Sequence, residues 1–82
     1  MDTYEKLIAN FTREIRVKPT HGIDRALTIF RRVLRKTKTE CGEIPHWDDI
    51  HDRFEEEVRM KTNWGYKQLV ELLDVTITEV GI

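Results

Sequence analysis

The chain has 82 residues and a mass of 9.8 kDa, which suffices for one domain with one core. Charged residues make up 35% of it and apolar residues 39%, and 14 Lys and Arg nearly balance 15 Asp and Glu. This composition excludes a disordered or low-complexity chain, and the single cysteine excludes a disulfide framework. No apolar run is long enough to span a membrane. We expect one soluble domain over residues 1–82.

The start of the sequence lacks the features of a secretory signal. Met1 leads into Asp2 and Glu5, with neither a basic start nor an apolar stretch. Cys41 has no second cysteine with which to form an internal disulfide. We therefore expect a cytoplasmic, reduced protein.

Apolar residues recur with helical spacing in four parts of the chain. The expected helices cover residues 3–15, 23–38, 46–60 and 63–75. Asp2 and Glu5 have the spacing of an N-terminal capping arrangement, and Pro45 suits the start of the third helix. The tail from 75 to 82 is ambiguous, because its β-branched residues favour a strand that would have no partner, so we expect a fraying helix.

The predicted fold class is all-α, a small bundle or orthogonal array of about four helices. A core of this size buries a smaller share of its surface than that of a larger domain. Apolar surface left over on the helices makes a homodimer one of the alternatives.

Charge is divided sharply along the sequence. Residues 12–38 carry nine basic and two acidic side chains, a net charge of +7, whereas residues 39–82 carry four basic and eleven acidic ones, a net charge of −7. On the second expected helix, the basic residues form two rows, Arg25 with Arg32 and Lys36, and Arg31 with Arg35 and Lys38. On the third, one row is acidic: Asp48, Asp49, Asp52, Glu55 and Glu56.

Two interpretations of these rows stand beside each other. In the first, the two helices are neighbours and their opposite charges flank a shared apolar seam. In the second, at least one row faces a partner of opposite sign, which speeds encounter through long-range steering. The expected partner-binding residues are therefore Arg25, Arg31, Arg32, Arg35, Lys36, Asp48, Asp49, Asp52, Glu55 and Glu56.

No motif indicates catalysis, a cofactor or a metal. The sequence has no phosphate-binding glycine loop and no dinucleotide fingerprint. Cys41, His46 and His51 lie five residues apart, without the close ligand pair of a structural zinc site. We predict no enzymatic activity, no catalytic residues, no cofactor and no metal ligands.

Two segments carry resemblances to nucleic-acid-binding families. Residues 16–32, with an extended basic lead-in, the pair Ala26-Leu27 and Phe30 followed by arginines, resemble the short arginine-rich ribosomal protein of the small subunit. The family's basic tail is replaced here by an acidic half. Residues 68–80 resemble the core of a helix-turn-helix, with Asp74 at the usual turn glycine. These resemblances imply a nucleic-acid-binding protein that uses helix 23–38, or a degenerate helix-turn-helix.

The function predicted first is the binding of another protein. Size, the absence of site chemistry and the divided charge favour a small non-enzymatic inhibitor, adaptor or regulator, of the kind found among accessory proteins of phages or mobile elements. Trp47 and Trp64 flank the third helix, either as lids on the core or as contact residues, because Trp is enriched at interface hot spots.

Overall fold

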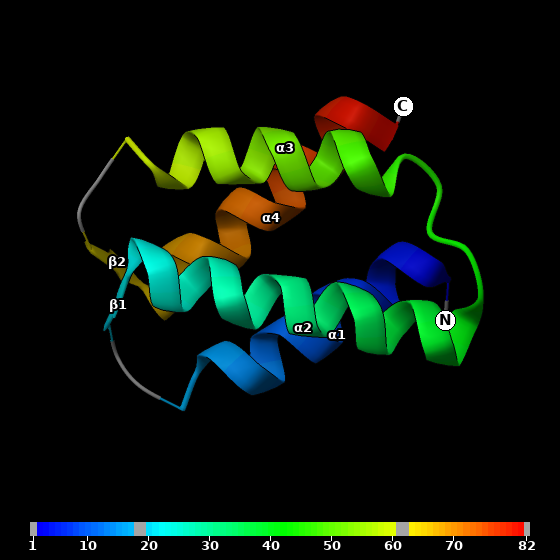
Figure 1. Cartoon of the computed structure of the whole chain (residues 1–82), viewed down its shortest axis with the longest axis horizontal. Coiled ribbons are helices and arrows are strands. Elements are labelled where there is room, and N and C mark those ends of the chain that lie inside the picture. Colours follow the sequence, from blue (N-terminus) through cyan, green and yellow to red (C-terminus); the bar gives the residue numbers. More distant parts are fainter. Residues whose placement is uncertain (1, 18–19, 61–62, 82) are drawn as a thin grey trace.

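Four helices make up most of the chain, as the spacing of its apolar residues predicts. The computed structural model describes residues 2–17, 20–60 and 63–81. Its helices are α1 (Thr3–Ile15), α2 (Ile23–Cys41), α3 (Trp47–Val58) and α4 (Tyr66–Gly81) (Figure 1). The predicted all-α fold class is confirmed. Within the described ranges, none of the helices combines the length and the apolar character that crossing a membrane requires.

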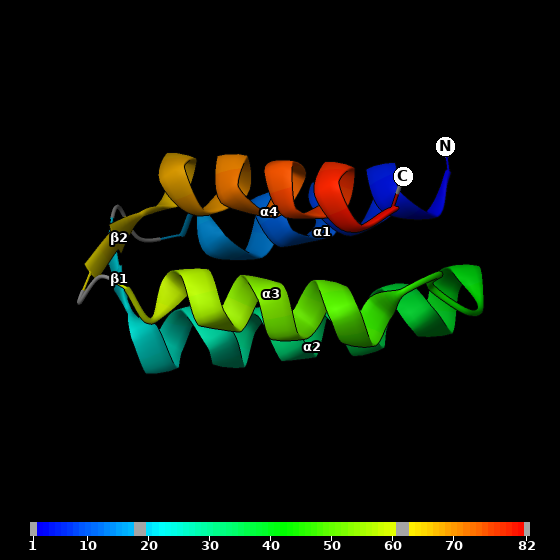
Figure 2. The same cartoon turned by 90° about the horizontal axis from the view of Figure 1, so that it is seen from above.

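The helices alternate in direction and form two layers, α1 with α4 and α2 with α3 (Figure 2). α1 packs closely on both α2 and α4, and α3 packs on α4. α2 and α3 approach each other less closely than these pairs do. The space between α2 and α3 is therefore bridged mainly by their side chains.

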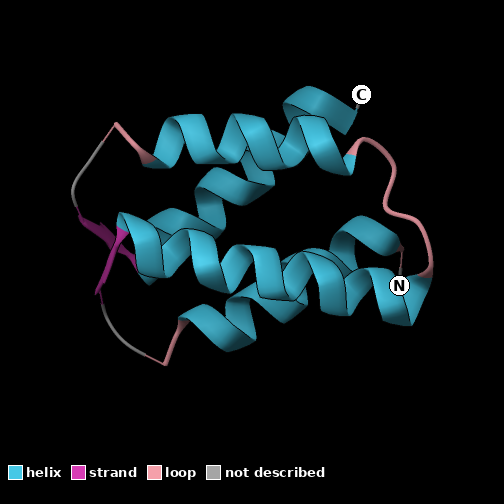
Figure 3. Ribbon diagram, viewed as in Figure 1, coloured by secondary structure: helices cyan, strands magenta, loops and turns pink. Residues whose placement is uncertain are grey.

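A short pair of strands joins two connections at one end of the bundle (Figure 3). β1 (Thr20–Gly22) pairs antiparallel with β2 (Asn63–Gly65), and the register places His21 opposite Trp64. The sequence did not predict this pair, because each strand has only three residues and its partner lies about 40 residues away in the chain.

The helix boundaries differ from the expected ones at several ends. α2 continues past the expected residue 38 to Cys41 and stops at Gly42, whose φ of 83° favours glycine. α3 is shorter than the expected 46–60, because His46 adopts a left-handed conformation with φ 58° and the helix closes after Val58. The N-terminal cap of α1 is confirmed, since Asp2 Oδ1 accepts the Glu5 N–H at 2.8 Å.

α4 covers residues 66–81 and not the expected 63–75. Asn63 lies in β2, where the expected helix would have begun, and the side chain of Gln68 accepts the Gly65 N–H. The ambiguous tail is helical as far as Gly81, and residue 82 lies outside the described residues. Thr76 and Ile77 are buried against the core, and this packing overrides their β-propensity. The turn that the helix-turn-helix resemblance implies at Asp74 is absent, since α4 is one continuous helix there.

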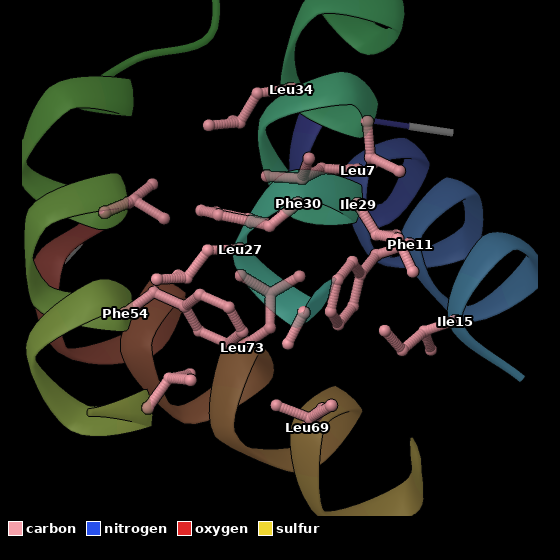
Figure 4. Close-up of a cluster of buried hydrophobic side chains, with 14 of the residues drawn as sticks. Leu7, Phe11, Ile15, Leu27, Ile29, Phe30, Leu34, Phe54, Leu69 and Leu73 are labelled. Carbon is pink, nitrogen blue, oxygen red and sulfur yellow. The ribbon is translucent and has the colours of Figure 1, made fainter. Parts of the chain in front are cut away.

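Three phenylalanines from three helices form the centre of the core (Figure 4). The ring of Phe11 meets those of Phe30 and Phe54 edge-on, with both centroid distances 5.7 Å. Phe30 and Phe54 lie 4.4 Å apart with tilted planes. Edge-to-face pairs of this kind add about 0.5–1.5 kcal/mol beyond the burial of their area. This cluster ties α1, α2 and α3 together, and Leu69 and Leu73 of α4 lie beside it.

Two polar side chains, Asn10 of α1 and Thr37 of α2, are buried in the contact between these helices. Asn10 is 1% exposed, and its Nδ2 donates to Thr37 Oγ1 at 3.0 Å and to Glu40 Oε1 at 2.9 Å. The hydrogen bond from Asn10, with lesser contributions from nearby Lys6, Lys36 and Arg13, holds the pKa of the Glu40 carboxyl below its ordinary value. Asn10 therefore couples a buried position on α1 to a surface carboxylate on α2.

Candidate binding groove between two helices

A groove opens on the outer side of the α2–α3 layer, between two helices that lie farther apart than the other packed pairs. We call it the α2–α3 groove. Its volume is about 360 Å³. The residues that line it come from α2, from the following connection and from the start of α3: Arg31, Leu34, Arg35, Lys38, Ile44, Trp47 and His51. It thus combines an apolar floor, an aromatic side chain and one of the two predicted basic rows.

The connection between α2 and α3 fixes the position of Trp47. Ile44 is fully buried and anchors this connection to the core. The hydroxyl of Tyr4, on α1, donates to the carbonyl of Pro45 at 2.9 Å. His46 then turns the chain into α3, so that Trp47 is its first residue. Trp47 remains 40% exposed at the mouth of the groove.

Trp47 and Trp64 have different environments. Trp64 is 9% exposed and donates its Nε1–H to the carbonyl of Val58 at 2.8 Å. It closes the core, as the lid interpretation predicts. Trp47 instead presents a large aromatic surface to solvent beside an apolar floor, which is how a contact residue at an interface is placed.

The cations on the α2 wall have unequal partners. Arg31 Nη2 lies 2.9 Å from Glu55 Oε2, and its Nε donates to Nε2 of His51 at 3.2 Å. The Nζ of Lys38 lies 4.6 Å from the centre of the Trp47 ring, a cation–π contact worth about 0.5–1 kcal/mol at an exposed site. Within the described ranges, no carboxylate lies within ion-pair distance of Arg35. Arg35 is therefore the cation best placed to receive an anionic group.

The acidic row of α3 divides into one inward and four outward members. Glu55 turns toward α2, where it meets Arg31, and it also lies 3.9 Å from Arg59. The other four side chains are exposed: Asp48, Asp49, Asp52 and Glu56. We call these four the outer acids. The shared seam predicted from the sequence thus exists through Glu55, while most of the row is accessible to a partner.

The second basic row lies on the α1 side of α2, away from the groove. Arg32 pairs with Glu14 of α1 at 3.0 Å. Arg25 and Lys36 share its helix face and are exposed. An exposed pair such as Arg32–Glu14 stabilises the fold by about 0–1 kcal/mol. The ten predicted site residues therefore do not form one cluster, and only Arg31 and Arg35 of them line the α2–α3 groove.

Sequence reasoning missed several members of the groove. Leu34 belongs to the apolar residues with helical spacing, and Ile44 lies in the connection between two expected helices. Both are buried, and their edges line the groove floor. His51 stacks on Phe30 at the edge of the core, with 6.0 Å between the ring centroids. The four-residue spacing of Trp47 and His51 was the available signal, because it places both on the side of α3 that faces α2.

A second groove lies between α1 and α4, with a volume of about 420 Å³. Its lining includes Ile8, Tyr66 and Val70, with Lys67 and Glu71 at its edge. It carries no row of like charges and no aromatic side chain as exposed as Trp47. The α2–α3 groove is consequently the better candidate for recognition.

The described residues contain no group of three or more His, Cys, Asp or Glu side chains positioned to hold a metal ion. Cys41 is exposed at the end of α2.

Compared with models of protein families, with curated proteins and with solved structures, the chain matches none of them.

Proposed function

We propose that this chain is a small non-enzymatic helical protein that binds another protein, acting as an inhibitor, adaptor or regulator. The observation that carries the proposal is the α2–α3 groove, in which an exposed Trp47 and an apolar floor lie between a basic wall and the outer acids. Protein interfaces commonly combine an aromatic anchor in a pocket with a charged rim.

The groove suits a protein segment that carries both an apolar and an acidic side chain. Leu34 and Ile44 reach the floor of the groove only with the edges of buried side chains, so the exposed aromatic face of Trp47 offers the main apolar contact. A partner carboxylate beside that apolar group would meet the guanidinium of Arg35, which favours planar two-point contact. Basic side chains of the partner would then meet the outer acids on α3.

A nucleic acid fits this surface less well. A single strand could stack on Trp47 and pair its phosphates with Arg35 and Lys38. Its phosphates would also lie near the outer acids along α3, and these carboxylates repel a polyanion. A protein with charges of both signs avoids that cost.

The test is capture of binding partners from a lysate, with and without nuclease, on the chain and on two matched variants. Arg35→Glu with Lys38→Glu reverses the groove wall, and Arg25→Glu with Lys36→Glu reverses the same number of cations on the α1 side. A protein that survives nuclease, is lost with the first variant and is retained by the second supports the proposal.

Two outcomes would contradict the proposal. Loss of every captured species after nuclease would favour the nucleic-acid alternative. Equal capture by both variants and by the unchanged chain would show that the α2–α3 groove is not the contact surface. Circular dichroism of each variant excludes unfolding as the cause of a loss.

A further inference from the structure

The outer face of the α2–α3 layer carries a charge pattern that is complementary to itself. On α2, one stripe at helical spacing holds Asp24, Arg31, Arg35 and Lys38. On α3, the facing stripe holds Asp48, Asp52, Glu55 and Arg59. We call these two stripes together the α2–α3 face. Each stripe is dominated by one sign, and the signs are opposite.

The antiparallel directions of α2 and α3 fix which positions lie at the same level (Figure 1). Arg31 reaches Glu55, and Lys38, seven residues further along α2, reaches Trp47, eight residues back along α3. These two contacts define the register across the groove. By this register Arg35 lies at the level of His51 and Asp52, and Lys38 lies at the level of Asp48.

The opposite charges at these levels do not neutralise each other within one chain. Among the described residues, Arg35 has no carboxylate within ion-pair distance. Asp52 Oδ1 contacts His51 Nδ1 at 3.2 Å, and Asp48 Oδ1 accepts the Asp49 N–H at 3.0 Å. The groove separates the two stripes, so Arg35 and Lys38 remain available to carboxylates from outside.

We propose that a second copy of this chain covers the α2–α3 face through a two-fold axis that runs parallel to the helices, along the groove. Such an axis places each α2 stripe over the α3 stripe of the other copy at the same level. Arg35 then meets the partner's Asp52, and Lys38 meets the partner's Asp48. The two Trp47 side chains lie at the same level beside the axis, over the two apolar floors.

The pattern holds at the other end of the face, where both signs are reversed. Asp24 is the acidic member of the α2 stripe, and Arg59 is the basic member of the α3 stripe. Both are exposed, and the same axis brings Asp24 near the partner's Arg59. A like-charge clash would have appeared at this end if only one of the two helices had changed sign.

Size and net charge also suit a second copy. The α2–α3 layer faces the viewer when the molecule is seen down its shortest axis, and in this view the Cα atoms of the molecule extend over 31 × 23 Å (Figure 1). A face of these dimensions is comparable to the ~800 Å² that each partner contributes to a standard interface. The net charge of −1 per chain adds little repulsion between copies. Because the rim is ionic, we expect weak association that added salt loosens by about tenfold in Kd.

Charge exchange provides the test, measured by sedimentation equilibrium at low and high salt. An acidic variant carries Arg35→Glu with Lys38→Glu, and a basic variant carries Asp48→Lys with Asp52→Lys. Each has like charges on both stripes, so neither alone should self-associate. An equimolar mixture of the two should form a heterodimer, and the chain with all four changes should recover the homodimer.

A control pair on the α1 side, Arg25→Glu with Lys36→Glu, should leave the homodimer unchanged within a factor of about two. All substituted positions are exposed, and circular dichroism verifies that each variant is folded. Self-association of the acidic and basic variants alone, or failure of their mixture to associate, would overturn the proposed interface. An unchanged chain that stays monomeric at low salt would overturn it as well.

This inference is separate from the proposed function, and because both use the α2–α3 groove, a second copy and another protein would compete for it. A monomeric chain whose groove variants still lose a nuclease-resistant partner would refute the homodimer and leave the proposed function in place. The opposite result is a homodimer that responds to the charge variants as expected, in a chain that captures no other protein through the groove. It would support the homodimer and refute the proposed function.

Discussion

Arg31 donates its Nε–H to Nε2 of His51 at 3.2 Å, which sets the tautomer of that imidazole. Because an arginine Nε only donates, Nε2 must be the acceptor, and the neutral ring carries its proton on Nδ1. That nitrogen lies 3.2 Å from Asp52 Oδ1, so a chain of hydrogen bonds runs from α2 through His51 to an outer acid. Protonation of Nε2 would remove the acceptor that Arg31 uses.

We expect nitrogen NMR of the His51 ring at neutral pH to show the Nδ1–H tautomer. Arg31→Leu removes the donor to Nε2, so the Nε2–H form should gain population in that variant. Arg35→Leu removes a neighbouring guanidinium that does not bond to the ring and should leave the tautomer unchanged. An Nε2–H ring in the unchanged chain would contradict this hydrogen-bond arrangement.

The three-ring cluster should dominate the stability of the fold. Phe54→Ala removes a fully buried ring that contacts two others, and we expect a loss of about 3–5 kcal/mol in the free energy of unfolding. Urea denaturation measures it, and Phe54→Leu serves as a milder variant if the alanine chain does not fold. Met60→Ala, at an exposed position, should change stability by less than about 0.5 kcal/mol.

The two tryptophans should respond differently to the same substitution. Trp64→Phe removes the donor to the Val58 carbonyl at a buried site, so we expect a loss of about 1–3 kcal/mol. Trp47→Phe keeps an aromatic ring at an exposed position and should cost less than about 0.5 kcal/mol. Urea midpoints of the two variants compare them directly. Equal losses would show that Trp47 is a structural residue as well.

The hydrogen bond from Asn10 to Glu40 should make stability depend on pH in the acid range. The pKa of Glu40 is lower in the folded chain than its ordinary value of 4.5. A lowered carboxyl pKa contributes stability above the unfolded pKa, and this contribution is lost as the pH falls through the folded pKa. Glu40→Gln should therefore reduce the loss of stability on acidification.

Thermal unfolding of the unchanged chain and of Glu40→Gln, across a pH series on both sides of 4.5, measures this difference. Glu43→Gln is the matched control, because this nearby exposed carboxylate has no hydrogen bond to a buried side chain among the described contacts. Parallel pH profiles for the two variants would contradict the role of Asn10.

The sequence predicted the helices where periodicity and local caps decide the structure. The segment 3–15 was predicted with the correct ends, because Asp2 caps it and its apolar face is continuous. The β1–β2 pair and the late start of α4 depend on contacts between distant residues, which no local pattern reveals. The C-terminal half of α4 could not be predicted without knowledge of the core, since burial of Thr76 and Ile77 outweighs their strand preference.

The candidate site was predictable only in outline. The charged rows follow from helical spacing, so the sequence located the basic part of one stripe and the acidic part of the other, without Asp24 and Arg59. It could not show that Glu55 turns toward Arg31 while Asp52 stays outside, because this depends on the distance between two helices. Nor could it show that Ile44, in a connection, completes the floor beneath Trp47.

The buried amide of Asn10 has a consequence for the uniqueness of the helix pairing. Leucine, isoleucine and phenylalanine side chains tolerate a slide of one helix along another, since a new apolar neighbour can replace the one that is lost. The amide does not tolerate such a slide. Moving α1 by one turn would separate its Nδ2 from both Thr37 and Glu40 and leave a buried donor without a hydrogen bond. Alternative alignments of the bundle are thereby penalised, and a single one is retained.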